Sequence, residues 1–265
     1  MDEQYIQKKV KGVADICFLL DATGSMQSCI DNLKTNIQVF INKLTTPDAN
    51  GGTVLKDWRI CIWGYRDFEY DPQNDAYDGI SKANNHLVIN PFTRNADEVR
   101  KQLEGLIAKG GGDEPESLLD ALYVLVSQGN TAKGASEDPG KWRYRSEAAR
   151  CVIVFTDATF HPIMSELSGA PGGTVEDVRN LLQQEKIRLS LFTPENADHI
   201  EEDFSCYGEL GATDKCVLET VPIPVGSTAI QAIRDLTANQ DHFQRVLEQL
   251  GKTISQSGAS DTEEL

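Results

Sequence analysis

Short apolar runs of strand length alternate with amphipathic helical patterns along most of this chain, and this alternation is the strongest constraint on its fold. The segments 13–20, 58–64, 151–155 and 187–192 are nearly continuous in apolar residues, which is typical of strands covered on both faces. After the first run, apolar residues recur every three or four positions from Ile30 to Leu44, as on the buried face of a helix. This order predicts an α/β fold with one doubly wound, mostly parallel central sheet flanked by helices.

The remaining elements follow the same alternation with weaker patterns. Short strands are expected over 86–90 and 216–221. Further helices are expected over 95–108 (with Ile107 on its inner face), 118–125, 175–185, 228–236 and 241–254. No internal repeat or linker divides the chain, so we expect an N-terminal extension over 1–12, one domain over 13–254 and a flexible tail over 255–265.

The charge balance restricts the class of partner. The chain has 25 Lys and Arg against 41 Asp and Glu, which gives a formal net charge of −16. A surface this negative repels phosphate backbones, so we expect no nucleic-acid partner. The hydrophobic share of 40% and the charged share of 25% are those of an ordinary globular protein, and they exclude collagen-like, coiled-coil and wholly disordered chains.

The N-terminus and the cysteines favour a cytoplasmic protein. Residues 1–11 are polar and lack the apolar run of a signal peptide, and no apolar run is long enough to span a bilayer, so no membrane partner is expected. The six cysteines have irregular spacings that fit no zinc site. Cys17, Cys61 and Cys151 lie inside predicted strands, which is typical of free core thiols in a reducing compartment.

Three polar clusters lie where chemistry is expected in such a fold. Asp21, Thr23 and Ser25 directly follow the first strand, Asp113 lies in a triple-glycine loop, and Asp157 directly follows the strand at 151–155. Ligands of doubly wound sheets bind outside the carboxyl ends of the strands, so these clusters can converge there. Carboxylates and hydroxyls together suit a hard cation such as Mg²⁺, which prefers oxygen ligands and keeps several waters.

The combined pattern resembles a known family. Asp21-Ala-Thr-Gly-Ser25 after an apolar strand resembles the metal-ion-dependent adhesion site (MIDAS) of von Willebrand factor A-type (VWA) domains, whose motif is D-x-S/T-x-S. The segment Gly110-Gly-Gly-Asp113-Glu-Pro-Glu116 is similar to the second metal loop of a subgroup, and Thr156-Asp157 is similar to the third. The segment Trp63–Asp67 also resembles the one that follows the second strand of the family, and the likeness extends over about residues 13–250.

The resemblance implies a metal site and a binding function. It implies direct metal contact by Thr23 and Ser25, and contact by Asp21 and Asp157 directly or through water, with Mg²⁺ as the ion and Mn²⁺ as the alternative. A further ligand is expected from the second loop, for which Asp113 is the candidate, although the sequence leaves open which residue of that loop reaches the metal. The resemblance also implies a protein partner whose acidic side chain completes the metal shell. Many relatives have Thr in the second loop, where this chain offers Asp113 with Glu114 and Glu116 beside it. Three carboxylates around one divalent ion leave a net charge of about −1, which disfavours an acidic partner side chain.

Simpler interpretations of the same residues remain open at this point. Asp21 and Ser25 could cap the following helix, and Asp157 could be an ordinary turn residue at a strand end. His161 could touch a ligand or be a loop residue without function. Arg66-Asp67 is expected to be an ion pair or a turn anchor near the site rather than catalytic.

Two further segments are candidates for ligand sites, and each also has a simpler interpretation. The acidic stretch 65–85 fails the EF-hand pattern, because Asp71, Gln73 and Asp75 are followed by Ala76 where the loop needs Gly. The basic and aromatic run 141–145 could bind phosphate or lead into the next strand.

Three functions compete on this sequence. The first is a metal-dependent module that binds a partner protein and is not an enzyme, since the chain shows no nucleophile–base pair, no G-x-S-x-G and no P-loop. The second is a Mg²⁺-dependent phosphohydrolase of the haloacid dehalogenase kind, although Thr23 stands where its motif needs a second Asp. The third is a structural or regulatory subunit whose metal site is degenerate or serves only stability.

Overall fold

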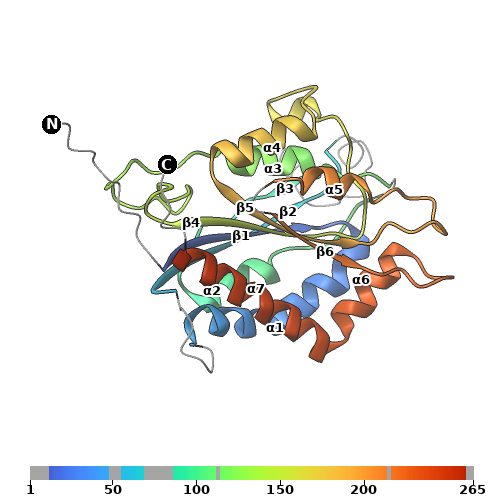
Figure 1. Cartoon of the computed structure of the whole chain (residues 1–265), viewed down its shortest axis with the longest axis horizontal. Coiled ribbons are helices and arrows are strands. Elements are labelled where there is room, and N and C mark those ends of the chain that lie inside the picture. The colour runs from blue at the N-terminus through green and yellow to red at the C-terminus, as the bar shows by residue number, and fades with distance from the viewer. Residues whose placement is uncertain (1–11, 48–54, 69–85, 112–113, 214–215, 261–265) are drawn as a thin grey trace.

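A computed structural model describes residues 12–47, 55–68, 86–111, 114–213 and 216–260. Six strands form one sheet in the order β3-β2-β1-β4-β5-β6 (Figure 1). The strands are β1 (Val13–Asp21), β2 (Asp57–Tyr65), β3 (Leu87–Val88), β4 (Ala149–Phe155), β5 (Ile187–Pro194) and β6 (Cys216–Val221). All neighbours pair in parallel except β3, which is antiparallel to β2. The predicted α/β class with a doubly wound, mostly parallel sheet is therefore confirmed.

Helices cover both faces of the sheet, as Figure 1 shows. The helices on one face are α1 (Gln27–Thr45), α2 (Ala96–Glu104), α6 (Ala229–Ala238) and α7 (Gln240–Ser260). The other face carries α3 (Leu118–Ser127), α4 (Val175–Gln184) and the short α5 (Cys206–Leu210). Alternate residues of β1 enter the two cores, with Cys17 and Leu19 on the α3–α4 side and Phe18 and Leu20 on the α1 side. This two-sided burial explains why the strand is apolar almost throughout.

The helix ends differ from the sequence prediction at two places. Helix α2 ends at Glu104 rather than near 108, and Ile107, expected on the inner face, is 53% exposed. Gly105 is the C-cap residue and donates its backbone N–H to the Lys101 carbonyl, and beyond it the Arg66 guanidinium binds the carbonyls of Ile107 and Lys109. Helix α7 runs to Ser260, six residues past its predicted end at 254, because no proline interrupts that polar stretch.

The strand order fixes where a ligand site can lie. The chain winds outward in one direction from β1 to β3 and in the other from β4 to β6, so the order reverses between β1 and β4. In open α/β sheets the loops at the carboxyl ends of these two strands diverge and leave a crevice for ligands. Asp21 ends β1, and Asp157 comes two residues after the last residue of β4.

Candidate metal centre

Asp21 is completely buried at the end of β1, and its carboxylate is held by neighbouring hydroxyls. Its Oδ1 accepts hydrogen bonds from the Thr23 backbone N at 2.9 Å and from Thr23 Oγ1 at 2.6 Å. Its Oδ2 accepts a hydrogen bond from Thr156 Oγ1 at 2.8 Å, and Thr156 directly follows β4. The loops after β1 and β4 are thus joined through this one carboxylate.

A continuous series of oxygen contacts runs from Asp21 to Asp157. Thr23 Oγ1 lies 3.3 Å from Ser25 Oγ, and Ser25 Oγ donates a hydrogen bond to Asp157 Oδ1 at 3.0 Å. The structure therefore brings together four of the five predicted site residues, although Asp157 is 132 positions from Ser25 in the sequence. The fifth, Asp113, lies outside the described residues.

The capping interpretation of the first cluster is wrong. Met26 is the N-cap residue of α1, and no side chain caps the helix there. Thr23 begins the short 3₁₀ turn Gly24–Met26, again without a side-chain cap. Asp21 Oδ1 instead accepts a hydrogen bond from Thr23 Oγ1. Ser25 Oγ contacts Thr23 Oγ1 and donates a hydrogen bond to Asp157 Oδ1.

Both buried carboxylates are short of positive charge. Burial raises the pKa of Asp21, against the hydrogen bonds from Thr23 and Thr156 and the more distant charge of Arg66. Burial and the charge of Asp21 raise the pKa of Asp157 to about 7. Asp157 is 3% exposed, and within the described part of the chain its buried Oδ2 has no hydrogen-bond partner. A cation between these carboxylates would remove the cost of burying their charges.

The donor set suits a hard divalent cation in kind. Two carboxylates and the hydroxyls of Thr23 and Ser25 are all oxygen donors, which Mg²⁺ prefers, and waters ordinarily fill its remaining positions. Among the residues that the structure describes, no three His, Cys, Asp or Glu side chains are grouped so that they could hold a metal ion. The hydroxyls are therefore essential to any such site, together with whatever the loop around Asp113 contributes.

Two glycines bring the second loop against the first. The backbone N of Gly24 donates a hydrogen bond to the Gly110 carbonyl at 3.1 Å. Gly111 has a φ of +76°, and a Cβ there would lie 3.0 Å from Thr23 Cβ and 3.2 Å from Glu116 Oε1. Only glycine fits this close approach in this backbone conformation. The described end of the triple-glycine loop thus lies directly beside Thr23.

Arg66 fastens the chain before the second loop. Its Nε donates to the carbonyls of Ala22 at 3.1 Å and Lys109 at 2.9 Å, and its Nη2 donates to the Ile107 carbonyl. The side chain is 3% exposed. The expectation that Arg66-Asp67 anchors a turn near the site is confirmed for Arg66, and the sequence signal was its place just after β2. Its three carbonyl partners and the hydrogen bond from Thr156 to Asp21 cannot be predicted from the sequence, because they join segments far apart in the chain.

The second and third loops are paired through their backbones. Glu116 N donates to the Thr159 carbonyl at 3.0 Å, and His161 N donates to the Glu116 carbonyl at 3.1 Å. The Glu114 carboxylate accepts a hydrogen bond from the Thr159 backbone, and its pKa is raised by burial and by the charges of Glu202 and Asp21. The His161 Nε2 lies 3.4 Å from Asp67 Oδ2.

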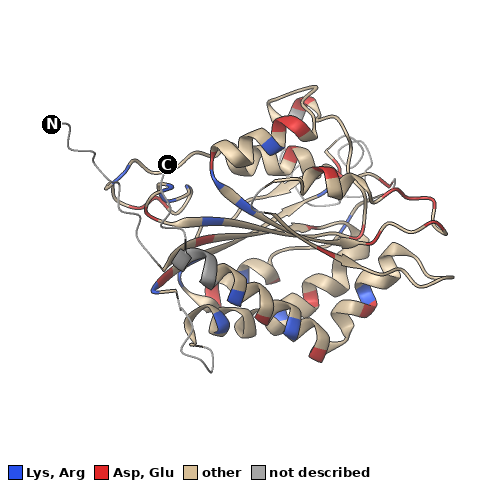
Figure 2. Cartoon of the chain, viewed as in Figure 1, with Lys and Arg blue, Asp and Glu red and all other residues tan. Residues whose placement is uncertain are grey.

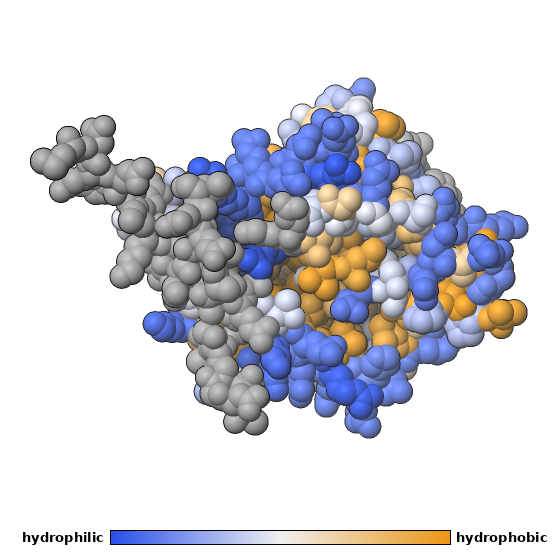
Figure 3. All heavy atoms as spheres, in the orientation of Figure 1, coloured by the Kyte–Doolittle hydropathy of each residue, from blue (hydrophilic) through white to orange (hydrophobic). Residues whose placement is uncertain are grey.

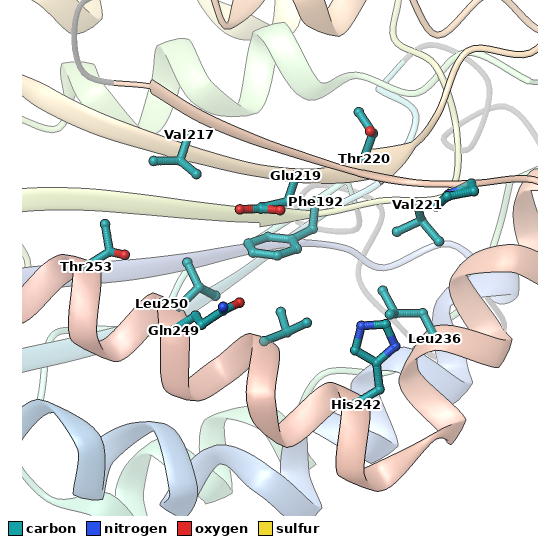
Figure 4. Close-up of a pocket in the computed structure, with 12 residues that line it drawn as sticks. Phe192, Val217, Glu219, Thr220, Val221, Leu236, His242, Gln249, Leu250 and Thr253 are labelled. Carbon is teal, nitrogen blue, oxygen red and sulfur yellow. The ribbon is translucent and has the colours of Figure 1, made fainter. Parts of the chain in front are cut away.

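A separate cavity of about 150 Å³ lies between the edge strand β6 and helix α7. It is lined by residues of β5, β6, α6 and α7, among them Phe192, Val217, Leu236 and Leu250 (Figure 4). Figure 3 shows apolar surface in the hollow between the sheet edge and α7. Glu219 and His242 are its titratable lining residues, and none of the predicted site residues lines it. The cavity therefore offers no chemistry that matches the polar loops.

Two further findings concern membrane-spanning helices and similarity to known proteins. No helix in the described ranges has the length and apolar character needed to cross a membrane. No protein-family model matches the chain, and no curated protein matches it. The chain is therefore assigned to an α/β Rossmann-like fold and to no family. The oxygen cluster between β1 and β4 is the feature from which a function can be inferred.

Proposed function

We propose that this chain is a VWA-like, metal-dependent module that binds a partner protein through a MIDAS-type site. Asp21, Thr23, Ser25 and Asp157 would hold Mg²⁺, or Mn²⁺ in its place, with Asp113 as the expected ligand from the second loop. The observation that carries the proposal is the series of oxygen contacts of 3.3 Å or less that joins Asp21, Thr23, Ser25 and Asp157 at the switch point.

The chemistry assigned to this site is binding rather than catalysis. When bound, the metal would supply an open coordination position for an oxygen of the partner. Asp21 and Asp157 would neutralise the divalent charge, and Thr23 and Ser25 would orient their hydroxyls toward it. Arg66 would keep the second loop in place through the carbonyls of Ile107 and Lys109. Free thiols at all six cysteines are in keeping with a cytoplasmic setting, which belongs to the same proposal.

Calorimetric titration with Mn²⁺ tests the metal site. The wild type should bind one ion, and Asp21→Ala and Ser25→Ala should each lose this binding. Asp235→Ala is the matched control, because Asp235 is an exposed carboxylate on α6. Retention of binding in Asp21→Ala would refute the proposed site.

Two further measurements separate binding from its alternatives. Partner capture should fall when EDTA is added, and a partner that binds equally well in EDTA would overturn the metal-dependent mode. Hydrolysis of p-nitrophenyl phosphate with Mg²⁺ should not exceed that of Asp21→Ala. A rate that depends on Asp21 would replace the binding module with a phosphohydrolase.

A further inference from the structure

The loops at the carboxyl edge of the sheet are free of basic residues over long stretches. The segments 110–132, 151–178 and 189–213 contain no Lys or Arg. The last of these carries six carboxylates, most of them in the loop that follows β5. Figure 2 shows this loop as a run of acidic residues at one end of the molecule. The loop that follows β5 is therefore strongly acidic, with no basic residue of its own to offset the charge.

Side-chain and backbone contacts place these acids around Asp157. Tyr207, which follows the acidic loop, donates its hydroxyl hydrogen to the Ala158 carbonyl at 2.6 Å, and its ring packs on Phe160 at 5.1 Å. On the other side Glu116 pairs with Thr159 through the backbone. The segment 157–160 consequently lies between the second loop and the loop after β5. We call the exposed or half-exposed acids of these two flanks the acidic rim: Glu114, Glu195, Asp198, Glu201, Glu202 and Asp203.

A buried group points to a ligand at the same place. Asp157, enclosed between the two flanks, is 97% buried, being 3% exposed, and its Oδ2 has no hydrogen-bond partner in the described part of the chain. A divalent ion would neutralise at most two carboxylates of the site, which leaves the charge of the rim in place. An acidic partner that approached this site would meet repulsion from both sides, whereas cationic side chains would be attracted.

We propose that the acidic rim docks a Lys- and Arg-rich segment of a partner protein, which brackets the metal site. The inference rests on the proposed function, because it names the kind of partner that the same site takes. It differs from the expectation of a purely acidic contact: an acidic side chain can reach the metal only when basic residues flank it. Attraction over this rim also predicts fast association that weakens as salt is added.

Two labelled decapeptides test the charge preference, one of alternating Lys and Ser and one of alternating Glu and Ser. Fluorescence anisotropy in low-salt magnesium buffer should show binding of the Lys peptide alone. The rim variant Glu201→Lys/Glu202→Lys should weaken this binding about tenfold. The control variant Glu104→Lys/Asp241→Lys makes the same change in net charge at exposed positions on α2 and α7, and it should weaken binding less than twofold.

The outcomes divide cleanly. Equal loss in the rim and control variants would show attraction to net charge alone and overturn the proposal. No binding of the Lys peptide, or equal binding of the Glu peptide, would overturn it as well. Failure of the metal site is seen separately, as absence of Mn²⁺ binding in the wild type. In that case selective loss in the rim variant would still support a basic partner.

Discussion

The two ends of strand β1 each bury an aspartate, and they satisfy it in opposite ways. At the amino end Asp15 is fully buried and accepts hydrogen bonds from Arg59 Nη2 at 2.7 Å and from Arg143 Nε at 2.8 Å. At the carboxyl end Asp21 is equally buried but is held by hydroxyls and one backbone amide. One carboxylate is bonded by two guanidinium groups, and the other has no cationic side chain among the hydrogen-bond partners described for it.

This contrast separates a structural ion pair from the candidate metal site. Arg143 also pairs with Asp57, and Asp57 pairs with Arg94, so the amino end forms a connected network. The carboxyl end instead gathers a second carboxylate, Asp157, whose pKa is raised to about 7 by burial and by Asp21. Unsatisfied buried charge of this kind is typical of functional sites rather than of structural ones.

The largest effect is expected at the amino end. Asp15→Asn leaves Arg59 and Arg143 buried without their shared carboxylate, and it should lower the free energy of unfolding by about 3–5 kcal/mol. Urea unfolding measures this change, with the exposed Asp241→Asn as a control that should stay near the wild type. A loss below about 1 kcal/mol would show that the two ends are not so different.

The pH dependence should have opposite sign at the two ends. The pKa of Asp157 is raised from 3.8 to about 7, so the protonated group stabilises the fold at low pH. In EDTA this contribution is fully present below about pH 3.8 and is lost as the pH rises through 7. Relative to Asp157→Asn, the wild type should therefore lose on the order of a few kcal/mol over that range. Parallel urea-unfolding curves for the two proteins would contradict this.

Asp57 should show the reverse behaviour. Its hydrogen bonds with Arg94 hold its pKa below the ordinary value of 3.8, with a further contribution from Arg143. The stability that it contributes is thus present above about pH 3.8 and is lost as the pH falls through its folded pKa. Comparing Asp57→Asn with the wild type between pH 2 and 6 checks the sign.

A smaller gain is expected from Asp21→Asn without metal. The substitution removes a buried charge whose pKa burial raises, while the amide oxygen can still accept from Thr23. In EDTA the variant should be about 1 kcal/mol more stable than the wild type, because hydroxyl donors already offset part of the cost. Chemical denaturation resolves this difference, and marked destabilisation would mean that the carboxylate has a structural partner.

The smallest effect is expected at His161. Its Nε2 lies 3.4 Å from Asp67 Oδ2, and its side chain is 24% exposed. His161→Ala should leave the metal-induced rise of the unfolding midpoint unchanged. A variant that no longer responds to Mg²⁺ would place His161 in the site and extend it toward Asp67.

The fold was predictable because strands that are buried on both faces have apolar residues at nearly every position. The strands β1, β2, β4 and β5 carry apolar residues on both of their faces and are therefore nearly continuous apolar runs. Their predicted bounds are close to the observed ones. Helix α5 was missed, since its five residues are too few to show a period. The end of α2 was misplaced because apolar residues continue at Leu106 and Ile107, beyond the C-cap residue Gly105.

The site was predictable only in part. Asp21, Thr23 and Ser25 are adjacent in the sequence, but their contact with Asp157 depends on β1 and β4 being neighbours. The ion-paired Asp15 was missed although an aspartate within an apolar strand demands a partner, because Arg59 and Arg143 lie 44 and 128 residues away. Of the two interpretations for the run 141–145, the structure favours the lead-in to β4, since Arg143 is buried against Asp15.

The central claim is that the carboxyl end of the sheet binds a divalent cation through Asp21. The most direct measurement is thermal unfolding of the wild type and of Asp21→Ala with increasing Mg²⁺. At a hundredfold excess over the dissociation constant, the wild-type midpoint should rise by about 5–10 °C, while that of Asp21→Ala should not move. A midpoint that stays constant in the wild type, or one that rises equally in both proteins, would contradict the account.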